Sequence, residues 1–281
     1  MGLKTIETLV VDIEKVLEEG TPVSDEIAEE FGRNMATLLK QRIGERDNKP
    51  GLRMSNVGTP CDRKLWLQVN QPEAREKLSA ATLLKFFYGD LIEETLLALA
   101  TLAGHTVTGR QGTLEIGGVV GHRDAVVDGV TVDVKSASTY SFNKFRAGNL
   151  RNDDPFGYID QLQSYIKAGQ GDELVTDKFR GAFLVADKTL GNLTLDIHEY
   201  DASRNLEEEF AAKQDMLRGH MPGRDFSPVP DGASGNMKLD TFCSYCDVKN
   251  TCHTNLRTFL YGNGPRFLTT VKRQPDVPEA L

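Results

Sequence analysis

Residues 121–135 read GHRDAVVDGVTVDVK, and this stretch contains the strongest indication of the fold. Two runs rich in β-branched residues flank the pair Asp128 and Gly129. An Asp-Gly pair is typical of a tight primed turn, because both of its residues tolerate a positive φ angle. The stretch therefore predicts a β-hairpin with its turn at this pair.

Three side chains of this hairpin carry chemically useful groups. Asp124 begins the first expected strand, and Asp133 and Lys135 lie two residues apart on the second, which places them on one face. Converging carboxylates suit Mg²⁺ or Mn²⁺. A neighbouring ammonium can orient a water molecule and stabilise a charged phosphate, as phosphodiester hydrolysis requires. The alternative is a surface hairpin with alternating polar residues, since an acid-x-Lys triplet also occurs by chance.

The rest of the chain alternates between helical and strand patterns. Apolar spacing predicts helices over 5–19, from Ser24 onward and over 79–103, and period-two patterns follow. Glycine and proline predict a loop over 44–60. These patterns indicate an α/β protein with a central mixed sheet. The later expected elements are a strand at 114–120, helices at 139–148, 156–168 and 202–218, and strands at 181–187 and 193–200.

The composition is that of a soluble globular protein. The 281 residues are 39% apolar and 26% charged, with 33 basic and 41 acidic side chains that give a net charge of −8. No apolar run approaches the roughly 20 residues that span a bilayer, and the first residues lack a signal peptide's pattern. We therefore expect no membrane partner and a cytoplasmic location, in a bacterial, archaeal or virus-infected host cell.

The net charge does not exclude a nucleic-acid partner, because the charge is unevenly distributed. Residues 1–30 hold 2 lysines and 9 acids, whereas residues 33–64 hold 8 bases and 3 acids. A solvated helix face is the simple explanation for the acidic run. The basic stretch leaves contact with DNA open.

The order of these motifs resembles the PD-(D/E)XK nuclease superfamily, in its RecB-type and lambda-exonuclease-like branches. The resemblance rests on Asp124, the triplet Asp133-Val134-Lys135 and the later pair Gln161 and Tyr165, which share a helix face. It implies a restriction-endonuclease-like core flanked by helices. It also implies that Asp124, Asp133 and the Val134 carbonyl bind metal, that Lys135 positions the water, and that Gln161 and Tyr165 support the site or contact DNA.

The same family supplies a further ligand from the preceding helix. Members often show Gly-x-x-x-His there, and this chain has Glu93 four residues after Gly89. Helical spacing places Glu93 in a mostly apolar stripe, where an unpaired acid is costly. We expect Glu93 to be a metal ligand; the alternative is a solvated helix acid.

The four cysteines form a second pattern, in which Cys61 stands far before Cys243, Cys246 and Cys252. Four thiolates suit a 4Fe–4S cluster or tetrahedral zinc, and spacing alone does not separate the two. The layout resembles that of iron–sulfur nucleases, including AddB-type domains and CRISPR-associated exonucleases. That resemblance implies a 4Fe–4S clasp around the nuclease core; zinc and unrelated core cysteines are the alternatives.

Together these features predict a metal-dependent DNA exonuclease in recombination or DNA processing. Its expected partners are single-stranded DNA or duplex ends, and a recombination or single-strand-binding protein. An endonuclease of the same superfamily and a non-catalytic DNA-binding or assembly module are the rival hypotheses. The expected organisation is a helical segment over 1–50, the core with its clasp over 51–255, and a tail over 256–281.

Overall fold

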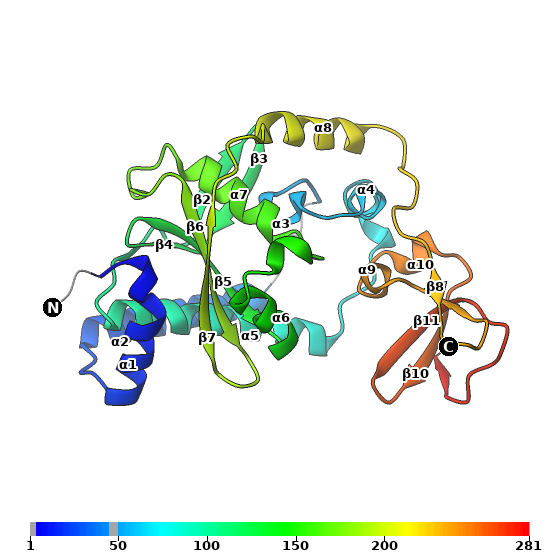
Figure 1. The fold of residues 1–281 in the computed structure, drawn as a ribbon, viewed down its shortest axis with the longest axis horizontal. Helices are drawn as coiled ribbons and strands as arrows, with labels where there is room; N and C mark the ends of the chain where they lie inside the picture. The colour runs from blue at the N-terminus through cyan, green and yellow to red at the C-terminus, as the bar shows by residue number, and fades with distance from the viewer. Residues whose placement is uncertain (1–3, 45–49, 281) are drawn as a thin grey trace. The chain divides into compact units, whose positions relative to one another are not determined.

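The computed structural model describes residues 4–44 and 50–280 (Figure 1). These residues form two compact units. The first takes in the described residues of 1–49, 53–58 and 79–211, and the second those of 50–52, 59–78 and 212–281. This division differs from the expected three segments, because the N-terminal helices belong to the hairpin's unit.

The first unit is built on a mixed five-stranded sheet with the strand order β1-β4-β5-β6-β7. Strands β5 and β6 pair in parallel, and the other neighbours pair antiparallel. The expected α/β architecture with a central mixed sheet is therefore confirmed. The strands are β1 (Val107–Thr108), β4 (Ala125–Val127), β5 (Val130–Ala137), β6 (Arg180–Asp187) and β7 (Leu193–Glu199).

Helices cover both faces of this sheet (Figure 1). Helices α1 (Leu9–Glu19) and α5 (Ala80–Leu102) bury apolar side chains against one face, and α6 (Thr139–Arg146) and α7 (Tyr158–Gly169) cover the other. Helix α2 (Asp25–Ile43) packs on α5. None of the described helices has the length and apolar character needed to cross a membrane.

The hairpin of β4 and β5 forms as the sequence predicts. Asp128 and Gly129 adopt φ angles of 49° and 80° at its turn. His105 is buried between the carboxylates of Asp128 and Asp12, with Nδ1 2.6 Å and Nε2 3.2 Å from the respective oxygens. The turn is thereby connected to α1, on which Asp12 lies.

Two sequence predictions near the hairpin were wrong in detail. The expected strand at 114–120 is two strands, β2 (Gly112–Ile116) and β3 (Val119–Arg123), because Gly117 and Gly118 adopt positive φ angles and reverse the chain. The expected loop at 44–60 contains the short helix α3 (Met54–Val57), and its residues 45–49 lie outside the described residues.

The second unit combines short helices with a five-stranded antiparallel sheet of order β12-β10-β11-β9-β8. Residues 256–281, expected as a tail, supply three of its strands. Helix α8 (Leu206–Arg218) runs from the first unit into the second. The other helices of the second unit are α4 (Asp62–Asn70), η2 (Pro72–Ala74), α9 (Thr241–Ser244) and α10 (Lys249–Cys252), and its strands are β8 (Val229–Pro230), β9 (Met237–Lys238), β10 (Arg257–Tyr261), β11 (Gly264–Thr270) and β12 (Glu279–Ala280). The short helices η1 (Ile6–Thr8) and η3 (Leu150–Asn152) belong to the first unit.

An ion pair between η1 and β6 makes the stability of the first unit depend on pH. Arg180 Nη1 donates to Glu7 Oε1 at 2.7 Å, and this hydrogen bond chiefly lowers the pKa of Glu7 from 4.5 to about 2. A lowered pKa in the folded state stabilises the fold above pH 4.5, and that stabilisation is lost as the pH falls toward 2.

We therefore expect Glu7→Gln to lower the free energy of unfolding near pH 6 by at most about 1 kcal/mol, since the pair is partly exposed. The variant and the parent should converge as the pH falls toward 2. Urea unfolding across a pH series measures both effects. An equal loss at every pH would contradict this assignment.

Candidate functional site

Asp124 lies where the ladder between β4 and β5 ends. Strand β4 pairs with β5 only as far as Ala125 opposite Val132. Beyond that pair, the Val134 N–H donates to Asp124 Oδ2 at 2.7 Å. Asp124 therefore stands between β3 and β4, one residue before the strand that it was expected to begin, and its carboxylate takes the place of a strand partner.

Asp133 and Lys135 lie on one face of β5, as the sequence predicts. Lys135 Nζ is 2.5 Å from Asp133 Oδ2, and the Asp133 residue is only 1% exposed. The same ammonium donates to Gln161 Oε1 at 3.3 Å and lies 4.7 Å from the centroid of the Tyr158 ring. The sequence analysis did not identify Tyr158, although its position three residues before Gln161 places it near the same helix face.

Helix α7 presents Gln161 and Tyr165 together, which confirms that they share a face. Gln161 Nε2 donates to the Tyr165 hydroxyl oxygen at 2.9 Å. Because Gln161 Oε1 accepts from Lys135, the amide group connects Tyr165 to the Lys135 ammonium. These contacts fix the position of the ammonium relative to α7.

Glu93 approaches the site from α5. Its Oε1 accepts from Gln111 Nε2 at 2.7 Å, a contact that the sequence analysis did not identify. The neighbouring Glu94 is buried and forms an ion pair with Arg110. Glu93 is therefore a partly buried acid held by an amide, and it is not a freely solvated helix residue.

Burial and neighbouring charges raise the pKa values of Glu93 and Asp124. Burial, followed by the charge of Asp133, raises the pKa of Glu93 from 4.5 to about 7. Burial and the charges of Asp133 and Glu93 also raise the pKa of Asp124. Burial alone would lower the pKa of Lys135, but the charges of Asp133 and Asp124 outweigh it and raise that pKa. The site thus concentrates negative charge, which favours a cation.

The chemistry of these oxygen donors suits Mg²⁺ or Mn²⁺, but their present arrangement is not a ligand set. In the described part of the chain, no group of three or more His, Cys, Asp or Glu side chains is placed to hold a metal ion. Asp133 Oδ2 is buried, and its partner among the described residues is the Lys135 ammonium beside it.

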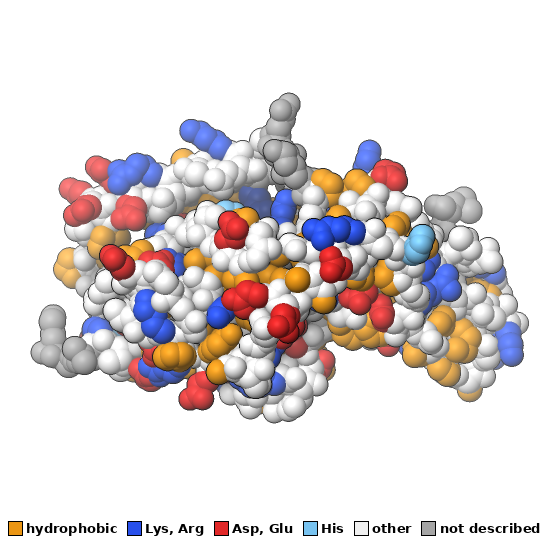
Figure 2. Space-filling model, turned by 90° about the horizontal axis from the view of Figure 1, so that it is seen from above, with side chains coloured by type: hydrophobic (Ala, Val, Ile, Leu, Met, Phe, Trp, Pro, Cys, Tyr) orange, Lys and Arg blue, Asp and Glu red, His pale blue; other side chains and the backbone are white. Residues whose placement is uncertain are grey.

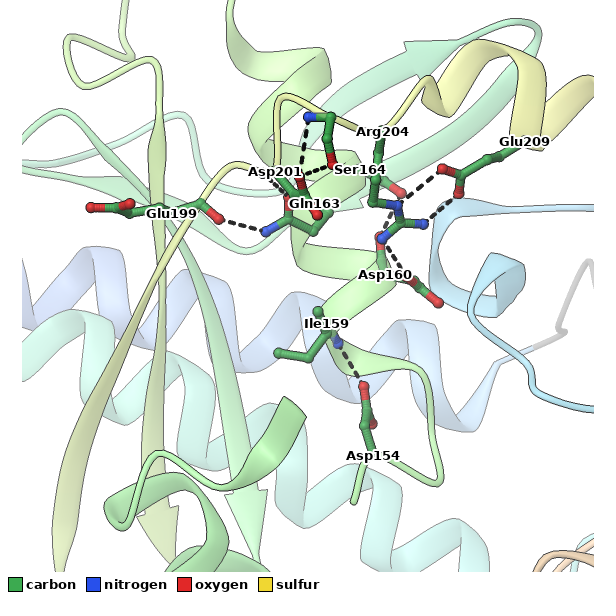
Figure 3. Close-up of polar contacts among 10 residues, drawn as sticks. Asp154, Ile159, Asp160, Gln163, Ser164, Glu199, Asp201, Arg204 and Glu209 are labelled. Carbon is green, nitrogen blue, oxygen red and sulfur yellow. Dashed lines mark hydrogen bonds and ion pairs between the residues drawn. The ribbon is translucent and has the colours of Figure 1, made fainter. Parts of the chain in front are cut away.

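Side chains on the far side of α7 hold the helix in place (Figure 3). Gln163 Nε2 donates to the Glu199 carbonyl at 2.9 Å, and the Asp201 N–H donates to Gln163 Oε1 at 2.8 Å. Arg204 donates to Asp160 at 2.7 Å and also contacts Glu209 of α8. The connection from β7 to α8 therefore fixes the helix that carries Gln161 and Tyr165.

Two glycines bring α3 and the start of α7 into backbone contact. Gly157 precedes α7 with a φ of 71°, and a Cβ there would lie 2.2 Å from the Gly58 carbonyl oxygen. A Cβ on Gly58 would lie 2.5 Å from the Gly157 carbonyl oxygen. Only glycine fits at either position, because both obstructing groups are backbone.

All four cysteines lie in the second unit. Burial is the main cause that raises the pKa of Cys61 to about 11 and that of Cys243 to about 12, and neighbouring thiols add to both shifts. Cys246 acts on Cys61 and Cys243, and Cys252 acts on Cys243. The thiols are therefore neighbours, but they are not placed as a metal site within the described residues, and the expected iron–sulfur clasp is not shown.

No protein-family model matches this chain, and no curated protein matches it. A solved structure described as the crystal structure of SSO0001 aligns with it at a TM-score of 0.39 and 13% sequence identity. That alignment covers 78% of this chain and 93% of the other. A likeness this low supports no conclusion about function, so the assignment of the site depends on its own residues.

Proposed function

We propose that the chain is a metal-dependent deoxyribonuclease, of the exonuclease type, with a restriction-endonuclease-like core. The observation that supports this most is the ion pair of the buried Asp133 with Lys135 on β5, with Glu93 and Asp124 close enough for the charge of Asp133 to raise both of their pKa values. A buried lysine next to a surplus of carboxylates suits hydrolysis of a charged ester.

In the proposed reaction, Glu93, Asp124, Asp133 and the Val134 carbonyl would hold Mg²⁺ or Mn²⁺. When bound, such an ion supplies a Lewis acid and lowers the pKa of water. Lys135 stays protonated, because the neighbouring carboxylates raise its pKa. It therefore orients the attacking water and stabilises the charge that develops on the phosphate.

Gln161 and Tyr165 act through Lys135 in this proposal. Gln161 accepts a hydrogen bond from the ammonium and donates one to the Tyr165 hydroxyl group. The amide thus restricts the directions in which Lys135 can donate. Gln161 and Tyr165 are positioning residues unless they also contact DNA.

The proposed substrate is DNA, as single strands or duplex ends. We propose that residues near the site bind it, rather than a broad basic surface. In the face drawn in Figure 2, acidic and basic side chains are interspersed. Such a surface provides no broad field for DNA. A recombination or single-strand-binding protein is the proposed partner, and the cytoplasm is the proposed location.

Digestion of end-labelled DNA tests the proposal. Linear single and double strands labelled at the 5′ or 3′ end, and covalently closed circles, are incubated with Mg²⁺, Mn²⁺ or EDTA. We expect linear DNA to shorten from its ends in the presence of metal, while circles stay intact. Cut circles would instead support the endonuclease. DNA binding without hydrolysis would support the non-catalytic module.

We also propose that Cys61, Cys243, Cys246 and Cys252 hold a 4Fe–4S cluster. The support is that these thiols, of which Cys246 is buried and the others partly buried, lie in one unit, and that Cys246 helps to raise the pKa values of Cys61 and Cys243. Four thiolates are the usual ligands of such a cluster.

Anaerobic purification tests the cluster. We expect iron and acid-labile sulfide with visible absorption, and we expect Cys246→Ser to lose most of the iron because one of four ligands is weakened. Ser244→Ala, between two of the cysteines, is the matched control and should keep the iron. Stoichiometric zinc without iron would refute the cluster.

A further inference from the structure

Phe156 exposes an aromatic ring close to the proposed catalytic lysine. The residue is 53% exposed, and its ring centroid lies 5.4 Å from that of Tyr158, with an angle of 31° between the rings. The Tyr158 ring in turn lies 4.7 Å from Lys135 Nζ. The Tyr158 ring therefore contacts both the partly exposed ring of Phe156 and the Lys135 ammonium group.

The turn that carries Phe156 is held by its own hydrogen bonds. Asp154 accepts from the Phe156 N–H at 3.3 Å and from the Ile159 N–H at 2.8 Å, the second of which is drawn in Figure 3. The contact of Gly157 with Gly58 fixes the next residue. Phe156 is thus held in place by the turn rather than by burial of its ring.

The charged side chains beside this turn make local contacts. Lys144 forms an ion pair with Asp153, and the Asp154 carboxylate is occupied by the two N–H groups. Arg151, five residues before Phe156, is exposed. The Phe156 ring is thus exposed on a turn that also carries the exposed Arg151, whose charge can attract an anionic strand.

We propose that Phe156 stacks on an unpaired nucleobase of the substrate strand and so places a phosphate beside Lys135. The inference rests on the proposed nuclease function. Every base has a π-face, so stacking on an exposed aromatic ring tolerates any sequence. The core beneath is complete without the ring of Phe156, because Phe145 and Phe183 fill it and Tyr158 packs against them. Phe156 is therefore available to the substrate.

The kinetic test combines protein variants with abasic DNA. Single-stranded oligonucleotides carry one abasic site at successive positions from the digested end. We expect Phe156→Ala to lower kcat/KM about 10-fold, mainly through KM. One abasic position should lower the parent's kcat/KM by a similar factor and have little further effect in Phe156→Ala.

Two matched variants define the controls. Phe156→Trp retains an aromatic face and should keep near-parental kcat/KM. Phe179→Ala removes a ring that is 64% exposed elsewhere in the same unit and should leave kcat/KM unchanged. Equal sensitivity of the parent and Phe156→Ala to every abasic position would overturn the stacking proposal.

A measurement without hydrolysis separates this inference from the nuclease assignment. An oligonucleotide that contains 5-iodouracil is bound to the protein in the presence of EDTA, and the complex is irradiated. Mass spectrometry then identifies the cross-linked residue. We expect a cross-link at Phe156 that Phe179→Ala retains. Hydrolysis without this cross-link would refute the stacking and leave the nuclease standing. The cross-link in a protein that never hydrolyses DNA would support the stacking and refute the nuclease.

Discussion

Lys135→Gln is expected to lower the rate of DNA hydrolysis by about 100- to 1000-fold, the range found when one group that stabilises the transition state is removed. Glutamine retains a hydrogen-bond donor for Asp133 but carries no charge. The loss should therefore fall on kcat, since the charge of Lys135 matters most when negative charge develops on the phosphate. Initial rates on end-labelled DNA at saturating substrate measure the effect.

Lys188→Gln is the matched control for this variant. Lys188 is exposed and lies directly after β6, so its replacement should leave the rate unchanged. Thermal unfolding shows whether Lys135→Gln keeps its fold. A folded Lys135→Gln protein with a rate within about threefold of the parent would contradict the assigned role of Lys135.

Gly157→Ala is expected to lower the free energy of unfolding by about 3 kcal/mol, because it combines an unfavourable φ angle with overlap between two backbone segments. The new Cβ would lie 2.2 Å from the Gly58 carbonyl oxygen and 2.4 Å from its carbon. Neither atom can move without displacing α3 from α7. Urea unfolding of the parent and the variant measures the loss.

Gly148→Ala separates the two contributions. Gly148 has a φ of 65°, and a Cβ there would meet nothing within 4 Å. Its replacement should therefore cost only the backbone strain, about 1 kcal/mol. Equal losses for the two variants would show that the close contact of Gly58 and Gly157 contributes nothing to stability.

The sequence predicted those parts of the first unit that local chemistry determines. The turn at Asp128 and Gly129 requires positive φ angles that this pair tolerates, and the structure shows them. Ser24 caps the second long helix through its side chain, as serine does at many helix starts. Gln161 and Tyr165 meet because helical spacing alone brings them together.

Other features depend on contacts between distant segments, and local patterns do not contain them. Gln111 reaches Glu93 from another element, and Tyr158 reaches Lys135 only when α7 packs on the sheet. The hairpin of β10 and β11 was missed although Gly262 and Asn263, a turn-forming pair, lie between its two strands. The charged and proline-containing composition of residues 256–281 favoured the prediction of a tail, although the turn pair indicated a hairpin.

The sequence predicted which residues belong to the candidate site, but it did not predict the contacts between their side chains. Asp133 and Lys135 lie together on β5 as predicted, whereas Asp124 lies one residue before β4 and contacts β5 through its carboxylate. The sequence did not show that Lys135 would pair with Asp133 so closely. Side-chain pairing depends on burial and on the surrounding charges, which the sequence pattern does not specify.

The packing of α1 limits where this chain can be truncated or joined to another protein in a chimera. Leu9 and Ile13 of α1 are fully buried in one cluster with Leu184 of the central sheet. His105 joins Asp12 of the same helix to Asp128 at the turn of the hairpin. The first helix is thus not a detachable module. A chimera joined at residue 50 would inherit the hairpin without the helix that supports its turn.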